Sequence, residues 1–159
     1  MKHEFLLALP IEPMELGATF PKGTQLPLHC TLMHWFEFRD GSDYRKLVNE
    51  LNRLSDAELV AAELISEGQD RFGSDNDVPV HVLKRTDELH ILHNRIFESL
   101  AWLDALPRES RWTGAGWRPH VTDTDTKFLV GRSHTPHEIV LVERIEDGAM
   151  HVCTRWYPG

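Results

Sequence analysis

The arrangement of apolar residues constrains the fold of this chain more than any other feature. Short apolar runs of strand length recur along the chain, and only two stretches repeat apolar residues at helical spacing. Runs of strands interrupted by single helices are typical of α+β proteins with mainly antiparallel sheets. The 159 residues suffice to bury one core without disulfides, so we expect a single domain over residues 1–159.

Turn and capping residues divide the chain into predicted elements. Residues 12–27 are rich in proline and glycine and are expected to form an ordered loop, and a second loop is expected around Arg71-Phe72-Gly73. Thr86 or Asp87 caps the second predicted helix. The predicted helices cover residues 42–54 and 89–103, and the predicted strands cover residues 3–11, 28–38, 58–67, 78–84, 118–124, 137–145 and 149–157.

The formal charge argues against two classes of partner. Lys and Arg number 17 and Asp and Glu 25, which gives a net charge of −8 with neutral histidines. Binding of duplex DNA or of an anionic membrane needs a positive field, so neither is expected, although a local basic cleft stays open. The apolar run from Phe5 to Pro10 is too short for a signal peptide or a membrane span, and we expect a cytoplasmic protein. A monomer is favoured, but the sequence leaves the oligomeric state open.

The cysteines and paired histidines give little support for a metal site. Cys30 and Cys153 form no CxxC pair, and we expect two reduced, buried thiols, with Cys30 a small core residue rather than a nucleophile. His90 and His93 are three residues apart on a predicted helix, but no carboxylate or cysteine stands at ligand spacing. We therefore expect no metal and no cofactor.

Two short strings repeat one chemical pattern. His29-Cys30-Thr31 and His120-Val121-Thr122 stand 91 residues apart, each within a predicted strand. Because residues i and i+2 of a strand point to the same face, each string presents an imidazole beside a hydroxyl. One alternative is that both histidines are structural and hydrogen-bonded within their own strands.

Paired imidazoles suit phosphodiester chemistry. Imidazole titrates near neutral pH, so one histidine can be neutral and take a proton while the other is protonated and gives one. Threonine hydroxyls can hold the phosphate oxygens on which charge builds in the transition state. His29, Thr31, His120 and Thr122 are the predicted catalytic residues, and this scheme requires no metal.

The residues around the two strings resemble a known family. Phe5 to Pro10 looks like its opening strand, residues 28–32 (LHCTL) fit its first motif, Phe72-Gly73 stands in the middle of the pattern, and residues 118–122 (RPHVT) look like its second motif. Over nearly the whole chain this resembles the two-histidine (2H) phosphoesterase superfamily, which includes the 2′-5′ RNA ligase-like proteins. The resemblance implies a bilobal fold in which two antiparallel sheets line a central groove with helices outside. It also implies hydrolysis or transfer at cyclic or 2′,5′-linked nucleotide phosphates, with His120 as the base and His29 as the acid.

The second motif departs from the family pattern. Asp123 stands where an apolar residue is usual, so either the strand ends early or the carboxylate is paired on the face away from the cleft. The stretch from Thr124 to Pro136 is short and polar, so a helix that often follows this motif is expected to be reduced or absent. Since such loops commonly select the substrate, the resemblance does not transfer a specific activity.

Three further residues are candidate substrate contacts. Arg118 shares strand parity with His120, so it either faces the cleft and binds phosphate or is a solvated arginine at the start of the strand. Met33 and Trp35 share parity with His29, so Trp35 either stacks on a nucleobase or packs at the end of the sheet. On the last strand, Tyr157 is the candidate, although the sequence does not decide whether it or Trp156 faces the groove.

These patterns predict a metal-independent phosphodiesterase that acts on a nucleotide or an RNA end. The alternatives are a module that binds the same ligand without turning it over, and a histidine-rich metal protein. The enzyme requires the nitrogens of His29 and His120 to lie within reach of one phosphate, across a groove between two sheets, with a locally positive surface. Neither the natural substrate nor the choice between hydrolysis and ligation follows from the sequence.

Overall fold

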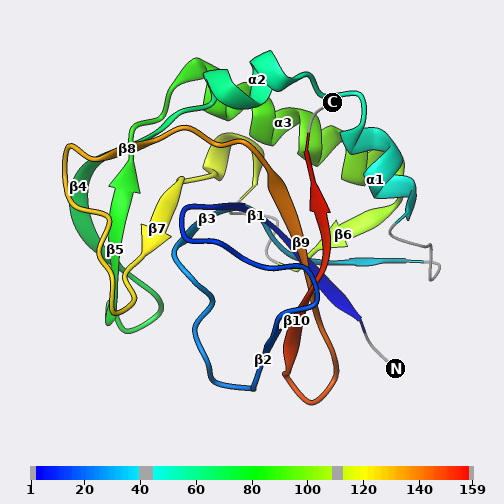
Figure 1. Ribbon diagram of the computed structural model, residues 1–159, viewed down its shortest axis with the longest axis horizontal. Helices are drawn as coiled ribbons and strands as arrows, with labels where there is room; N and C mark the ends of the chain where they lie inside the picture. Colours follow the sequence, from blue (N-terminus) through cyan, green and yellow to red (C-terminus); the bar gives the residue numbers. More distant parts are fainter. Residues whose placement is uncertain (1–2, 40–44, 109–112, 158–159) are drawn as a thin grey trace.

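The computed structural model describes residues 3–39, 45–108 and 113–157 and has the expected α+β fold. Helices lie along one side of a curled sheet, at the top of the view (Figure 1). Strands β4 and β5 are at the left, and β9 and β10 are right of centre. The helices are α1 (Arg45–Leu51), α2 (Asp56–Ala61) and α3 (Asp87–Trp102), with a short 3₁₀ turn at Gly114–Gly116. The strands are β1 (Glu4–Pro10), β2 (Thr19–Phe20), β3 (His29–Phe38), β4 (Leu64–Phe72), β5 (Val78–Leu83), β6 (Ala105–Pro107), β7 (His120–Thr122), β8 (Ser133–His134), β9 (Ile139–Arg144) and β10 (Met150–Trp156).

The sheet consists of two halves that meet at the two His-x-Thr strings. Its strand order is β2-β10-β9-β1-β3-β7-β5-β4-β8, with β6 beside β3, and every pairing is antiparallel. The junction is the short pairing of β3 with β7, at Cys30 and Val121. The two sheets expected from the sequence are thus joined edge to edge into one curled sheet.

The main core lies between the helices and one face of this sheet. Helix α3 begins at its N-cap Thr86, whose side chain accepts a hydrogen bond from the Leu89 backbone N–H. Its apolar stripe is buried against the sheet and comprises Leu89, Leu92, Ile96 and Leu100. Each such side chain stabilises the fold by about 2 kcal/mol through burial. A second, smaller apolar cluster covers the opposite face of β1, β9 and β10.

Helix α2 corrects the prediction of a strand over residues 58–67. Ser55 and Glu58 form a capping box, in which each side chain accepts a hydrogen bond from the other residue's backbone N–H. This local signal starts a helix within the predicted strand, and β4 begins only at Leu64. The strand then continues through Phe72, so Arg71 and Phe72 lie in the sheet rather than in the predicted loop.

Several boundaries also differ from the prediction. The first helix begins at Arg45 in the described part of the chain, and residues 42–44 of the predicted helix lie outside the described residues. The short strands β2, β6 and β8 were not predicted, because strands of two or three residues depend on a partner strand rather than on a pattern of their own. None of the helices in the described ranges is long and apolar enough to cross a membrane.

Candidate functional site

The two His-x-Thr strings lie on neighbouring hydrogen-bonded strands. Cys30 on β3 pairs with Val121 on β7 in antiparallel register, which sets Thr31 opposite His120 and His29 opposite Thr122. Residues on either side of this pair point to the other face, so both histidines and both threonines share one surface. His29 and His120 are diagonal neighbours, a relation in which backbone positions are about 7–8 Å apart. They therefore lie side by side on one curled sheet rather than across a gap between two sheets.

Both motif imidazoles are oriented in the same way. His29 Nδ1 lies 2.7 Å from the carbonyl oxygen of Pro27, and His120 Nδ1 lies 2.8 Å from that of Arg118. A carbonyl oxygen only accepts, so Nδ1 carries the hydrogen in both rings. Within the described ranges, neither Nε2 atom has a hydrogen-bond partner. Each neutral ring therefore offers a free lone pair at Nε2.

Burial keeps both motif histidines neutral in the free protein. Loss of water around His29 lowers its pKa, the Pro27 carbonyl opposes this shift, and the nearby His120 lowers the pKa further. The pKa of His120 is also lowered, first by burial, against the effect of the Arg118 carbonyl and with a further contribution from the Arg118 charge. A bound phosphate would reverse this balance, because its negative charge favours the protonated form of either ring.

A third histidine, His34, joins the site and was missed in the sequence. Its ring is stacked on that of His120 with centroids 6.1 Å apart, and it is half-buried. Burial, followed by the charges of His120 and His29, lowers the pKa of His34 to about 4. If the side chains of β3 alternated strictly from His29 onward, His34 would face the helices.

A β-bulge explains why His34 faces the site. The register between β1 and β3 shifts between the pair Ala8–Thr31 and the pair Leu7–Met33, so one extra residue enters β3 there. Leu32 and Met33 are consequently both buried in the main core. Met33, expected on the face of His29, lies on the helix side instead. In the sequence, the feature that could have indicated this bulge is the pair of adjacent apolar residues Leu32 and Met33 within an otherwise alternating strand.

A cavity of about 460 Å³ opens beside His120. His34, Phe72, Arg118 and His120 are among the residues that line it. The Phe72 ring packs edge-on against the His120 ring at 4.5 Å, and the Arg118 guanidinium lies 4.6 Å above the Phe72 ring. The lining includes His120 but not His29, so only one of the two motif histidines borders this cavity.

The three predicted substrate contacts lie in different places. Arg118 lines the cavity, where its guanidinium forms an exposed ion pair at 3.1 Å with Asp70. Trp35 is half-buried against the second apolar cluster, with the Arg144 guanidinium 4.0 Å above its ring. Tyr157 is exposed near Arg155, and its neighbour Trp156 is buried in the main core. Neither Trp35 nor Tyr157 lines the cavity.

Of the two histidines on α3, His93 is held within the fold, and His90 lies beside the Arg85 guanidinium. His93 Nδ1 donates to the Leu32 carbonyl at 2.9 Å, and the Gly114 N–H donates to its Nε2 at 2.9 Å, so both nitrogens are occupied. The ring also stacks on Trp117 at 4.1 Å. Over the described parts of the chain there is no cluster of three or more side chains suited to a metal ion.

Both thiols are free, and the predicted burial is found for Cys30 but only in part for Cys153. Cys30 is fully buried beneath the site, and Cys153 is partly buried. Burial raises the pKa of each thiol to about 12, so neither carries an appreciable thiolate fraction at neutral pH.

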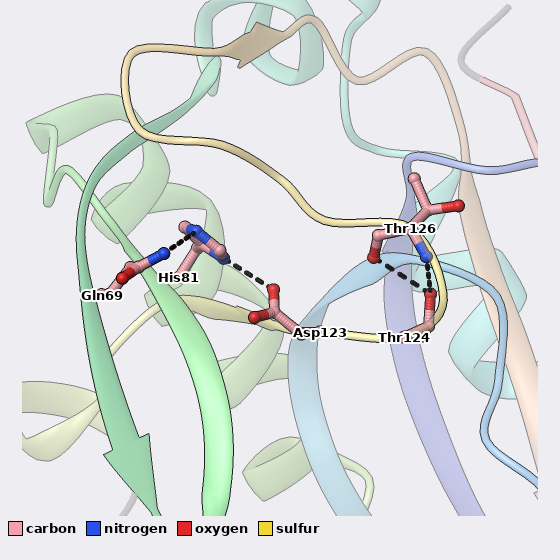
Figure 2. A network of polar contacts seen from close by, with 5 residues as sticks. All are labelled: Gln69, His81, Asp123, Thr124 and Thr126. Carbon is pink, nitrogen blue, oxygen red and sulfur yellow. Dashed lines mark hydrogen bonds and ion pairs between the residues drawn. The ribbon is translucent and has the colours of Figure 1, made fainter.

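Asp123 is paired on the face opposite the motif histidines, and β7 ends just before it. Its Oδ1 atom lies 2.6 Å from Nδ1 of His81, which is fully buried on β5. On the other side of the ring, the Gln69 amide lies 3.3 Å from His81 Nε2, so the three side chains form a chain across β4, β5 and the end of β7 (Figure 2). Both possibilities raised by the irregular motif therefore hold, namely an early strand end and a paired carboxylate.

Comparison with known proteins gives a likeness of fold. No protein-family model matches the chain, and no curated protein matches it by sequence. A solved structure described as the crystal structure of a phosphoesterase superposes with a TM-score of 0.57 at 14% sequence identity and covers 98% of each chain. At that identity the likeness shows a shared fold over the full length.

Proposed function

We propose that this chain is a metal-independent phosphodiesterase that hydrolyses a cyclic or 2′,5′-linked phosphodiester of a nucleotide or RNA end. One observation carries the proposal. Two imidazoles on adjacent strands share one face of the sheet, and each is held by Nδ1 so that Nε2 is free. The shared fold with a phosphoesterase and the resemblance of both motifs to the 2H superfamily support the same reaction.

In the proposed reaction one histidine acts on the attacking water and the other acts on the leaving oxygen, on opposite sides of the phosphorus atom. One neutral imidazole takes a proton from a water molecule as the water oxygen attacks phosphorus. The other imidazole, protonated when the anionic substrate binds, gives its proton to the leaving oxygen as the P–O bond breaks. Proton exchange with solvent then restores both rings. By the resemblance to the superfamily, His120 is the base and His29 the acid.

The two motif threonines can stabilise the negative charge that develops on the phosphate oxygens in the transition state. Thr31 and Thr122 each stand two residues beyond a motif histidine on the same face. Their hydroxyls can donate to non-bridging phosphate oxygens, on which negative charge increases during attack. His34, which lines the cavity beside His120, is a further candidate contact for the substrate.

Single substitutions of the motif histidines test this proposal. His29→Ala and His120→Ala are each expected to lower the turnover of 2′,3′-cyclic nucleotides by about 100-fold or more, because each removes a proton-transfer group. The assay uses chelator-treated enzyme, and circular dichroism checks that both variants fold. His151→Ala, a half-buried histidine of β10 outside the site, is the matched control.

Full activity in both variants would exclude paired acid–base catalysis. Binding of every cyclic phosphodiester in a panel without any product would instead identify the groove as a non-catalytic nucleotide-binding module. Activity that disappears with the chelator and returns with a divalent ion would contradict the metal-independent mechanism.

A further inference from the structure

The two motif imidazoles are held by the carbonyl groups of two chemically different peptides. His29 Nδ1 donates to the carbonyl oxygen of the Pro27–Leu28 peptide. His120 Nδ1 donates to the carbonyl oxygen of the Arg118–Pro119 peptide. The first of these peptides has an N–H group, whereas the second has none, because the nitrogen of a proline carries no hydrogen. Only the peptide that holds His29 can therefore donate a hydrogen bond of its own.

Glu12 accepts that hydrogen bond. Its Oε1 atom lies 2.8 Å from the backbone nitrogen of Leu28. A chain of two hydrogen bonds, of 2.8 and 2.7 Å, therefore runs from the carboxylate through the Pro27–Leu28 peptide to Nδ1 of His29. Hydrogen bonds in such a chain polarise one another, and an ionised acceptor strengthens them. The charge of Glu12 thus makes the carbonyl group that holds His29 a stronger acceptor.

The fold fixes Glu12 in this position. The backbone N–H groups of Ile11 and Glu12 both donate to the Leu28 carbonyl at 2.9 Å, which ties the end of β1 to the start of β3. A longer contact of 3.4 Å joins the second carboxylate oxygen to the hydroxyl of Thr126, which forms a turn with Thr124 (Figure 2). No lysine or arginine in the described ranges forms an ion pair with Glu12, so no neighbouring cation neutralises its charge.

The charged groups near the two rings differ in the same sense. Burial lowers the pKa of His120, the Arg118 carbonyl opposes this shift, and the Arg118 guanidinium lowers the pKa further. The titratable groups that bear on the His29 ring are His120 on β7 and His34 on β3. On β1, its register partner Pro10 is uncharged. One ring thus lies near a cation, whereas the other is linked to an anion.

From this asymmetry we propose that Glu12 is a positioning residue that acts through the Pro27–Leu28 peptide to favour the protonated form of His29 over that of His120. The inference rests on the proposed function and deepens it, because it gives two equivalent motifs different roles on grounds found in this chain. Protonated His29 gives the proton on Nε2 to the leaving oxygen and keeps the hydrogen on Nδ1. Neutral His120 takes a proton from the attacking water at its own Nε2.

The substitution Glu12→Gln removes the charge and keeps the geometry. The amide oxygen of glutamine still accepts the Leu28 N–H, so a residue that only braces the loop would tolerate this change. The matched control is Asp147→Asn in the turn between β9 and β10. Asp147 also accepts a backbone N–H, from Ala149 at 2.8 Å, but that peptide holds no motif histidine. Circular dichroism checks that both variants fold.

Titration of single histidine rings measures the charge effect without any turnover. Proton–carbon NMR follows the rings in the presence of sulfate, a tetrahedral anion that keeps its charge across the titration, and signals missing in His29→Ala and His120→Ala identify the two rings. In Glu12→Gln the pKa of His29 is expected to fall, with an acid dissociation constant about fivefold higher than in the wild type. The dissociation constant of His120 should change by less than about twofold, and Asp147→Asn should alter neither ring.

Kinetics test the consequence for the proposed reaction. At low pH the acid is protonated in both proteins, so the kcat values of the wild type and Glu12→Gln for a 2′,3′-cyclic nucleotide should be nearly equal. As the pH rises, the variant loses the protonated form of His29 first, so the ratio of the two kcat values should increase to about fivefold. KM should stay within about twofold, because Glu12 is not among the residues that line the cavity.

The two measurements separate this inference from the hydrolysis itself. If no cyclic phosphodiester is turned over but the pKa of His29 alone falls in Glu12→Gln, the role of Glu12 stands and the proposed hydrolysis fails. A change of less than about twofold in the dissociation constant of His29, or equal changes at both histidines, would overturn the role of Glu12 whatever the activity. In an active enzyme, a kcat ratio that is independent of pH would overturn it too.

Discussion

The two His-x-Thr motifs present the same side chains to one face of the sheet but are supported differently on the other. The first lies on β3, a strand of ten residues, and Cys30 beneath it is fully buried in the apolar core. The second lies on β7, a strand of three residues, and beneath its end Asp123 is held by the buried His81. Both motifs therefore rest on the apolar core, through Cys30 and Val121, and the second is in addition held at its end by a polar network.

This difference determines how well each half of the site tolerates substitutions. Apolar packing is non-directional and accepts substitutions of similar volume. A buried polar chain is favourable only when every member has its partner, and it is unfavourable when one is removed. We therefore expect the β7 half to be the more fragile one.

The largest effect is expected from breaking the polar network. Asp123→Leu leaves His81 Nδ1 buried without an acceptor, which should lower the free energy of unfolding by about 3 kcal/mol. Asp123→Asn keeps an acceptor oxygen and should lose only about 1 kcal/mol. Urea unfolding monitored by circular dichroism measures both values.

The double variant His81→Leu/Asp123→Leu sharpens the comparison. Because both polar partners are removed together, its loss should be smaller than the sum of the two single losses. Additive losses, or an Asp123→Leu protein as stable as the wild type, would show that the network does not support β7.

An effect of similar size is expected at acid pH through His93, which lies behind the first motif and donates to the Leu32 carbonyl. Burial lowers the pKa of His93 to about 4, below that of an unfolded histidine near 6.5. The unfolded chain therefore takes up its proton first as the pH falls. The contribution of His93 is complete above about pH 6.5 and decreases by about 3 kcal/mol by pH 4.

Unfolding in urea between pH 7 and pH 4 tests this effect. His93→Phe keeps a ring against Trp117 but cannot titrate, so its stability should be lower at pH 7 and should depend less on pH. An equally steep decrease in this variant would assign the acid sensitivity to other groups.

The smallest effect is expected beneath the first motif. Cys30→Ala removes one buried sulfur atom and should lower the free energy of unfolding by about 1 kcal/mol through a small cavity. Turnover should stay within about twofold of the wild type, because apolar packing tolerates this change. A loss of stability as large as that of Asp123→Leu would contradict the contrast between the two halves.

Much of the fold could be predicted from the sequence because its signals are local. The apolar periods correctly indicated β1, β3, β5, β9, β10 and α3, and Thr86 marked the start of α3. The predicted strand over residues 58–67 was right for residues 64–67, which begin β4, but wrong for residues 58–61, because the capping box of Ser55 and Glu58 was not recognised. The short strands β2, β6 and β8 could not be predicted, since their hydrogen-bond partners are remote in sequence.

The sequence by itself determined the chemistry that the site carries: two histidines, each two residues before a threonine, on strands whose alternation sets both side chains on one face. Only the tertiary structure decided what surrounds them. A bulge in β3 turned His34 toward His120, and the β4–β5 hairpin brought Phe72 and Arg71 to the same cavity. Register and strand pairing depend on contacts between distant segments, and no local pattern in the chain encodes those contacts alone.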